Sequence, residues 1–261
     1  MNLTDTEILK FLHGSPVFID DICAVFPATL GEIAEIGYDN FQKYLSIITA
    51  TKPDKSNVRN DNDLINLLNE LSDYQYILLL TKFDDNIYKT LKESFKFFCH
   101  EDVIFSFDPA QIVIGPIEEK HILTEEKFYE FRQIIRYMYF LDIASEDVVI
   151  NEKDDPRVRA IKEKIRKGNQ TRQEIRKKEA QSQGIAEINF SDLVGSIPLN
   201  DCNLNIANIW NITYYAFHDQ LKRMGWRDQF NINHRAALAG AKINNKQLKH
   251  WIRSIKSYDE N

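Results

Sequence analysis

The sequence is poor in cysteine and has no long apolar run. Its three cysteines (Cys23, Cys99 and Cys202) are odd in number and form no CxxC pair, which excludes a secreted disulfide scaffold and fits buried thiols in a reducing compartment. The longest strictly apolar run, residues 76–80, is far shorter than the roughly 20 residues of a membrane helix. The first residues have neither the basic nor the apolar region of a signal peptide. We therefore expect a soluble, cytosolic protein.

Recognisable catalytic motifs are also missing. The sequence has no GxxxxGK[ST], GxGxxG, HExxH or GxSxG, and its 9 glycines are too scattered to form a phosphate cradle. The best enzyme candidate is Asp108 followed by Glu118, Glu119 and Lys120, an order that loosely resembles metal-dependent nucleases. Asp108 falls in an expected turn, however, so a solvated hairpin edge is favoured. The prediction is a protein that is not an enzyme and has no cofactor.

No metal site is expected either. Cys99 and His100 are adjacent on an expected helix and point about 100° apart, so they cannot chelate as a pair. His218, His234 and His250 recur every sixteen residues but belong to different expected helices. Ordinary surface or packing histidines are therefore favoured over a metal-binding triad.

Charge is divided unevenly along the chain, although the formal net charge is only −6. Residues 1–152 carry 13 Lys/Arg and 27 Asp/Glu, whereas residues 153–178 carry 11 and 4. This division predicts three parts: an acidic helical domain with β-hairpins (1–152), a basic linker or helix (153–184) and an aromatic-rich helical domain (185–261).

The expected fold class is mainly α, of the α+β kind. Apolar, β-rich runs predict one hairpin at residues 16–26 and a second at residues 103–114, with its turn at residues 108–110. Helical spacing of apolar residues covers most of the rest of the first 140 residues. Thr29 and Glu32 form a capping box before a long helix in which Gly37 is the weak point.

The basic tract has too few apolar residues to bury much surface. It could contact phosphates or an acidic protein, but no aromatic residue is interleaved in it, so a charged linker is favoured and a nucleic-acid partner is disfavoured. Its candidate binding residues are Arg157, Arg159, Lys162, Lys164, Arg166, Lys167, Arg172, Arg176, Lys177 and Lys178.

The C-terminal part is helical and rich in aromatics. Thr213 is expected to cap one helix, and residues 231–233 to begin another that Gly240 closes. A weak helix-turn-helix pattern over residues 235–254 leaves DNA binding open. Most of the aromatics are expected in the core, but some can anchor a partner; the candidates are Trp210, Tyr214, Phe217, Trp226 and Trp251.

Several stretches at both ends of the chain carry a recognisable pattern. They are LGEIAEIG (30–37), YLS (44–46), IWNIT (209–213), FHDQLKR (217–223), NIN (231–233), ALAGA (237–241) and LKHWI (248–252). In this order they resemble a family encoded in the morphogenesis modules of tailed bacteriophages and prophages of Gram-positive bacteria. The chain is similar to the tail assembly chaperone type.

The resemblance implies a helical protein that acts in the host bacterial cytoplasm during infection. It would bind the tape measure protein, keep its long helices soluble and help to recruit tail tube protein. Such chaperones often occur as a short form and a frameshifted long form, and the basic tract could be the joint between them. Two alternatives stay open: a structural component of the tail end or baseplate that remains in the virion, and a DNA-binding phage protein that uses the basic tract and the C-terminal helices.

Overall fold

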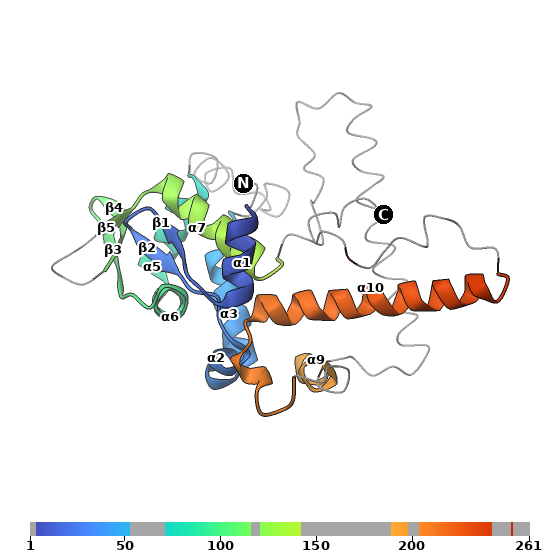
Figure 1. Ribbon diagram of the computed structural model, residues 1–261. Coiled ribbons are helices and arrows are strands. Elements are labelled where there is room, and N and C mark those ends of the chain that lie inside the picture. The colour runs from blue at the N-terminus through green and yellow to red at the C-terminus, as the bar shows by residue number, and fades with distance from the viewer. Residues whose placement is uncertain are drawn as a thin grey trace, which may run out of the picture. The chain divides into compact units, whose positions relative to one another are not determined.

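A computed structural model gives the fold of the chain (Figure 1). It describes residues 4–52, 71–115, 121–141, 189–197, 204–241 and 252. The chain divides into two compact units, one formed by residues 1–140 and 210–260 and the other by residues 141–209 with Asn261. Helices predominate in the described residues, and two small antiparallel sheets accompany them. The expected fold class, mainly helical α+β, is confirmed.

The first unit contains seven described α-helices. Threonine or serine N-caps begin most of them, because the side-chain hydroxyl accepts a hydrogen bond from an otherwise unpaired N–H in the first turn. The helices are α1 (Asp5–His13), α2 (Leu30–Ile36), α3 (Tyr38–Ile48), α5 (Asp73–Phe83), α6 (Asp85–Cys99), α7 (Glu125–Met138) and α10 (Tyr214–Leu238).

Both expected hairpins are present. Strands β1 (Val17–Ile19) and β2 (Cys23–Val25) pair antiparallel, as do β3 (Val103–Phe107) and β4 (Ala110–Ile114). A third strand that the sequence pattern did not predict, β5 (His121–Leu123), extends the second hairpin to the order β3-β4-β5. Three residues are too few to display a clear alternation, which explains why this strand was missed.

The expected long helix after Thr29 is interrupted at the predicted weak point. Gly37 ends α2 and precedes α3 with φ 84°, a conformation in the left-handed half of φ space that glycine adopts readily. The Thr29–Glu32 capping box is confirmed: Glu32 N donates to Thr29 Oγ1 over 3.2 Å, and Thr29 N donates to Glu32 Oε2 over 2.7 Å.

The C-terminal helix differs from the prediction. Residues 231–233 do not begin a new helix but lie inside α10, which is continuous from Tyr214 to Leu238. Asparagine costs well under 1 kcal/mol in a helix interior. Here the Asn233 side chain accepts a hydrogen bond from Gln229 Nε2 over 3.0 Å, and the rings of Phe230 and His234 stack at 5.8 Å. These contacts one turn apart favour continuation over a break.

The second unit has one described α-helix, α9 (Phe190–Ser196), followed by the start of the short 3₁₀ helix η3 (Ile209–Asn211). Asn189 N donates to Asp192 Oδ2 over 2.9 Å, the backbone half of a capping box. Val194 and Ile197 are buried.

The expected three-part division stays a prediction. The expected basic linker, residues 153–184, lies outside the described residues, as do residues 142–152 before it and 185–188 after it. The described residues add a feature that the division did not anticipate: the first turns of α10 belong to the same compact unit as residues 1–140. Within the described ranges, none of the helices combines the length and hydrophobicity needed to cross a bilayer.

The core of the first unit lies between the second sheet and helices α5, α6 and α7. Phe95 and Phe131 stack with their ring centroids 4.9 Å apart, and neither is exposed. Tyr74 of α5 fastens the sheet from this side, because its hydroxyl donates to Leu123 O and accepts from Ile112 N, each over 2.9 Å. One side chain thus ties α5 to β4 and β5.

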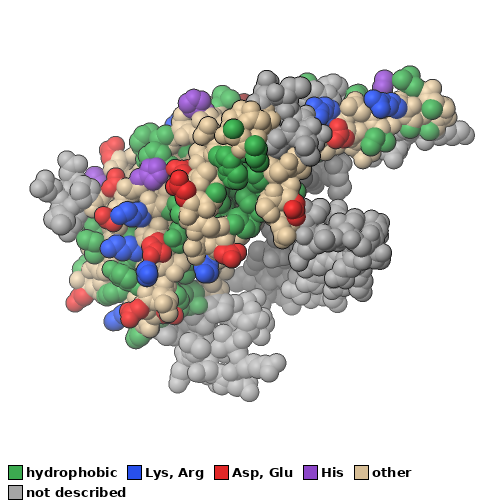
Figure 2. Space-filling model, turned by 90° about the horizontal axis from the view of Figure 1, so that it is seen from below, with side chains coloured by type: hydrophobic (Ala, Val, Ile, Leu, Met, Phe, Trp, Pro, Cys, Tyr) green, Lys and Arg blue, Asp and Glu red, His purple; other side chains and the backbone are tan. Residues whose placement is uncertain are grey.

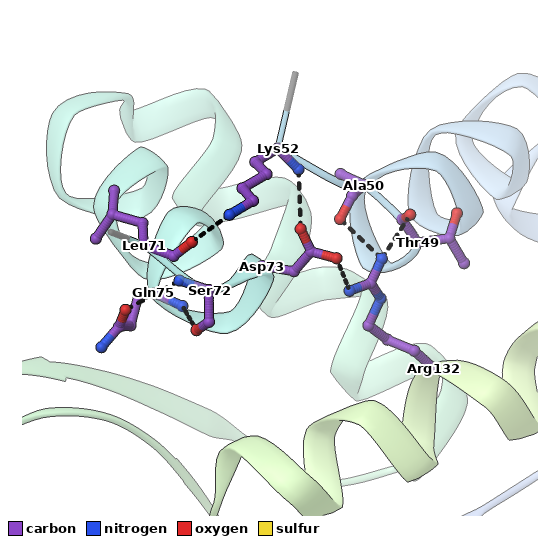
Figure 3. Close-up of polar contacts among 8 residues, drawn as sticks. All are labelled: Thr49, Ala50, Lys52, Leu71, Ser72, Asp73, Gln75 and Arg132. Atoms are coloured by element: carbon purple, nitrogen blue, oxygen red, sulfur yellow. Dashed lines mark hydrogen bonds and ion pairs between the residues drawn. The ribbon is translucent and has the colours of Figure 1, made fainter. Parts of the chain in front are cut away.

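Arg132 of α7 joins three helices from a buried position (Figure 3). Its Nη2 donates to the carbonyls of Thr49 and Ala50 at the C-terminal end of α3, and its Nη1 donates to Asp73 Oδ2, all over 3.0 Å. The other oxygen of Asp73 accepts from the backbone N–H of Lys52 over 3.0 Å. The guanidinium therefore satisfies carbonyls that α3 leaves unpaired and holds the start of α5 beside them.

Replacing Arg132 by Met tests how much stability this contact contributes. The variant leaves the two carbonyls and Asp73 without their charged donor, so we expect the free energy of unfolding to fall by about 2–4 kcal/mol in urea titrations. The matched control is Lys89→Gln, which removes the exposed Lys89–Glu93 pair on α6 and should change stability by less than about 0.5 kcal/mol. Equal effects of the two substitutions would contradict this account.

Candidate functional site

Two helices of the first unit begin at one shared point. Thr29 and Thr213, the N-caps of α2 and α10, form an isolated antiparallel β-bridge. Leu30 N donates to Ile212 O over 3.0 Å, and Tyr214 N donates to Ala28 O over 2.8 Å. The bridge joins the segments that carry the resemblance at the two ends of the chain, and we call it the threonine junction.

Thr213 makes contacts on both sides of the junction. Its hydroxyl donates to the carbonyl of Phe11 in α1 over 2.8 Å and accepts from Ala216 N in α10 over 3.0 Å. Thr213 is only 3% exposed, so these hydrogen bonds are shielded from water. A single hydroxyl therefore caps α10 and binds it to the last part of α1.

Glycine allows the backbones to approach closely around the junction. A Cβ added at Gly31 in α2 would lie 3.0 Å from the carbonyl oxygen of Trp210, a backbone atom that cannot easily move. Gly14, with φ 87°, would place a Cβ 3.3 Å from Cγ2 of Thr213. Gly31, the first glycine of the LGEIAEIG stretch, is thus required by the close approach of the Trp210 backbone.

An aromatic cluster fills the space beneath the junction. Phe41 of α3 is fully buried, and its ring lies 5.3 Å from those of both Tyr139 and Tyr214. Tyr139 accepts a hydrogen bond from Ala28 N over 2.9 Å, and burial raises the pKa of its phenol. Phe217 is fully buried as well. The first turns of α10 are therefore part of the core.

The predicted partner-binding aromatics differ in how far they are buried. Tyr214, 7% exposed, and Phe217, 0% exposed, face the core, so in this structure they offer no surface to a partner. Trp210 is 38% exposed beside the junction, and Trp226 is half-buried on α10. Trp251 and the whole basic tract from Arg157 to Lys178 lie outside the described residues. Trp210 and Trp226 are the candidates whose side chains reach the described surface.

A polar group that the sequence analysis missed lies one turn further along α10. Asp219 is 6% exposed and accepts from Arg223 Nε over 2.7 Å, while its Oδ1 has no hydrogen-bond partner. Lys222 Nζ lies 4.1 Å above the ring of Phe140, and burial lowers its pKa. The i,i+4 spacing of Asp219 and Arg223 was visible in the sequence, but their burial depends on contacts of α10 with the rest of the unit.

His218 adjoins this group and is held neutral. Its ring lies 4.3 Å from that of Tyr214, and Nε2 is buried without a hydrogen-bond partner. Burial, aided by the charge of Lys222, lowers the pKa of His218 to about 4. The histidine packs among aromatics, as the sequence analysis favoured for histidines in this part of the chain.

Exposure rises steeply along α10. No described residue after Asp219 in this helix is buried, and Ile232 and Leu238 are 62% and 76% exposed. Figure 2 shows hydrophobic side chains beside acidic and basic ones along the end of the helix that extends from the rest of the unit. The part of α10 from Gly225 to its end is therefore a surface with both apolar and charged side chains.

Among the residues that the structure describes, the other sequence candidates do not assemble into a site. Asp108 lies in the turn between β3 and β4, as expected, whereas residues 118–120 lie outside the described residues. Cys23 and Cys99 are buried free thiols, and the His100 ring stacks on Phe26 at 4.1 Å. Among the residues that the structure describes, no three His, Cys, Asp or Glu side chains gather as a metal site would require.

Comparison with known proteins supports the phage part of the expectation. Residues 177–256 match the family described as the YomV second domain, a stretch that contains α9 and α10 and amounts to less than half of the chain. This match points to a phage-associated protein family. No curated protein and no solved structure matches the chain.

Substitutions at Thr213 test the threonine junction. Thr213→Val keeps the side-chain shape but loses both hydroxyl bonds, so we expect the free energy of unfolding to fall by about 2–3 kcal/mol. Thr213→Ser keeps the hydroxyl and should cost less than about 1 kcal/mol. The control Thr124→Val removes only the cap of α7 and should cost about 1 kcal/mol. A valine variant no worse than this control would show that the bond to Phe11 contributes nothing.

The lowered pKa of His218 predicts a stability change in mild acid. Below pH 6.5 the unfolded chain binds a proton at this histidine, but the folded chain does so only near pH 4. The stability contributed by the neutral ring is therefore complete above pH 6.5 and is lost as the pH falls toward 4, by on the order of 1–2 kcal/mol at pH 5. Urea titrations of His218→Gln should show a smaller loss between pH 7 and pH 5 than the wild-type chain. His234→Gln, at an exposed position of the same helix, should leave the loss unchanged.

Proposed function

We propose that this chain is a phage tail assembly chaperone that acts in the host cytoplasm by binding, not by catalysis. Its partners would be the tape measure protein, whose long helices it keeps soluble, and tail tube subunits. The observation that carries the proposal is the threonine junction. Two of the stretches that resemble the chaperone type, residues 30–37 and 209–213, meet there. The match of residues 177–256 to a phage-associated family supports the same origin.

The arrangement of α10 suits such a role. Its first turns are fixed in the core by Thr213, Tyr214 and Phe217, whereas its later part exposes Ile232 and Leu238. A helix anchored at one end and exposed at the other can offer apolar side chains to another helix without unfolding the domain that holds it. Binding would bury Ile232 and Leu238 against the partner helix, and it would remove the apolar stripe of that helix from water.

Co-expression with the tape measure protein encoded downstream tests the proposal. We expect the tape measure protein to be soluble and to co-purify with the wild-type chain, and to precipitate when expressed alone. The double variant Ile232→Ser/Leu238→Ser should retain less of it, because the substitutions remove exposed apolar surface from α10. A matched control, Leu9→Ser, removes a side chain that is 64% exposed on α1 and should behave as wild type.

Two outcomes would contradict the proposal. If the two proteins neither co-purify nor affect each other's solubility, the chaperone function fails. If mass spectrometry detects the chain as a constituent of purified phage particles, a structural component of the tail end or baseplate is the better description, because an assembly chaperone is released. Binding to DNA that weakens steeply with salt would instead favour a nucleic-acid function.

A further inference from the structure

The outward face of the second sheet carries an unbroken apolar row. Ile104 of β3 lies opposite Val113 of β4, and Val113 lies opposite Ile122 of β5. Ile104 and Ile122 are 44% and 50% exposed, and Val113 is half-buried. We call these three residues the isoleucine row.

The opposite face of the sheet already supplies the core. Val103, Phe105, Ile112, Ile114 and Leu123 are buried there. Helix α5 packs against β3 and β4, and α6 packs against β3 (Figure 1). An antiparallel sheet with one covered face usually has polar residues on the other, which keeps that face in water at no cost. Three aliphatic side chains aligned across three strands are therefore not explained by folding of the described residues.

Acidic residues border the isoleucine row. Asp102 precedes β3 and Asp108 follows it, and both are exposed. Asp102 pairs with Lys96, whose Nζ lies 3.7 Å from its Oδ1, and both side chains are largely exposed. A second copy of this chain would bring the same carboxylates to the same place, so repulsion disfavours a symmetric pairing of two such faces.

We propose that the isoleucine row binds a basic amphipathic helix of a partner protein. Strands lie about 4.8 Å apart, so the row is about 10 Å long from Ile104 to Ile122. Apolar residues at positions i, i+3 and i+7 of a helix span about 10 Å along its axis. A helix laid along the row, across the strands, can therefore place one apolar side chain on each strand. Lys or Arg beside that stripe would face Asp102 and Asp108 at the two ends of β3.

This inference extends the proposed function. It rests on that function in one respect only, namely that the partner is helical. The row lies on β3, β4 and β5 and includes no residue of α10, so it is a separate set of contact residues. The charge of residues 1–152, 13 Lys/Arg against 27 Asp/Glu, adds long-range attraction for the same basic partner.

Peptide binding to the full chain tests the inference without a phage partner. The probe is a fluorescein-labelled helical peptide of about 18 residues with Ile at i, i+3 and i+7 of each repeat and Lys elsewhere. Its control is a scrambled peptide of the same composition. By fluorescence anisotropy we expect the patterned peptide to bind at least about tenfold more tightly than the scrambled one, and Ile104→Thr/Ile122→Thr to remove that difference. Threonine keeps the β-branched shape, so the sheet should be retained, which circular dichroism and thermal melting check.

A matched control variant is Phe18→Thr, which removes an apolar side chain 62% exposed on β1 and should leave the preference for the patterned peptide intact. Equal binding of both peptides, or an unchanged preference in the double isoleucine variant, would overturn the proposal. So would a wild-type chain that dimerises in sedimentation experiments through a contact that Ile104→Thr/Ile122→Thr abolishes, because a second copy would then cover the row. If the wild-type chain keeps the tape measure protein soluble but shows no preference for the patterned peptide, the proposed function stands and the site on the sheet fails. If it prefers the patterned peptide but does not keep the tape measure protein soluble, the site on the sheet stands and the proposed function fails.

Discussion

The fold of the first unit depends on the bridge between Thr29 and Thr213. Closing a loop of this length costs chain entropy, although the cost grows only slowly with loop length. The junction offsets it with two backbone hydrogen bonds, the hydroxyl bond from Thr213 to Phe11 and the burial of Tyr214 and Phe217. Because both threonines are N-caps, the same bridge also fixes where α2 and α10 begin. Removing residues 209–219 would therefore expose the rings of Phe11, Phe41 and Tyr139 that α10 now covers.

The junction also sets the gradient of exposure along α10. The helix is anchored at its N-terminal end, where the cap, the aromatic rings and the Asp219–Arg223 pair lie within the first three turns. Beyond Met224 the contacts with the rest of the unit diminish, so side chains such as Ile232 and Leu238 remain in water. Arg132 has a comparable role at the C-terminal end of α3, where it holds α3, α5 and α7 together from a buried position.

Local sequence patterns predicted most of the helices and strands of this fold. They could not predict contacts between segments that are distant in the sequence. The Thr29–Glu32 box, the break at Gly37 and the two hairpins are encoded within a few residues, so their sequence signals were sufficient. The asparagines at 231 and 233 looked like a helix start because capping residues are ambiguous when they occur inside a helix. Tyr214 and Phe217 looked available to a partner because nothing near them in the sequence shows that α1 and α3 cover them. The isoleucine row was equally invisible, since it exists only through the register of three strands.

The use of aromatics in the core bears on how this protein can bind. Large rings usually supply the anchors of tight interfaces, and here many of them are already buried within the unit. The described surface offers aliphatic side chains, such as Ile104, Ile122 and Ile232, and separate exposed rings, such as Phe18 and Phe83, among solvated charges. Contacts of that kind give modest affinity and depend on salt, because exposed charges are screened and aliphatic truncations cost little each. The proposed chaperone would have to hold a partner during assembly and then release it, and a combination of modest affinity and salt dependence suits that role.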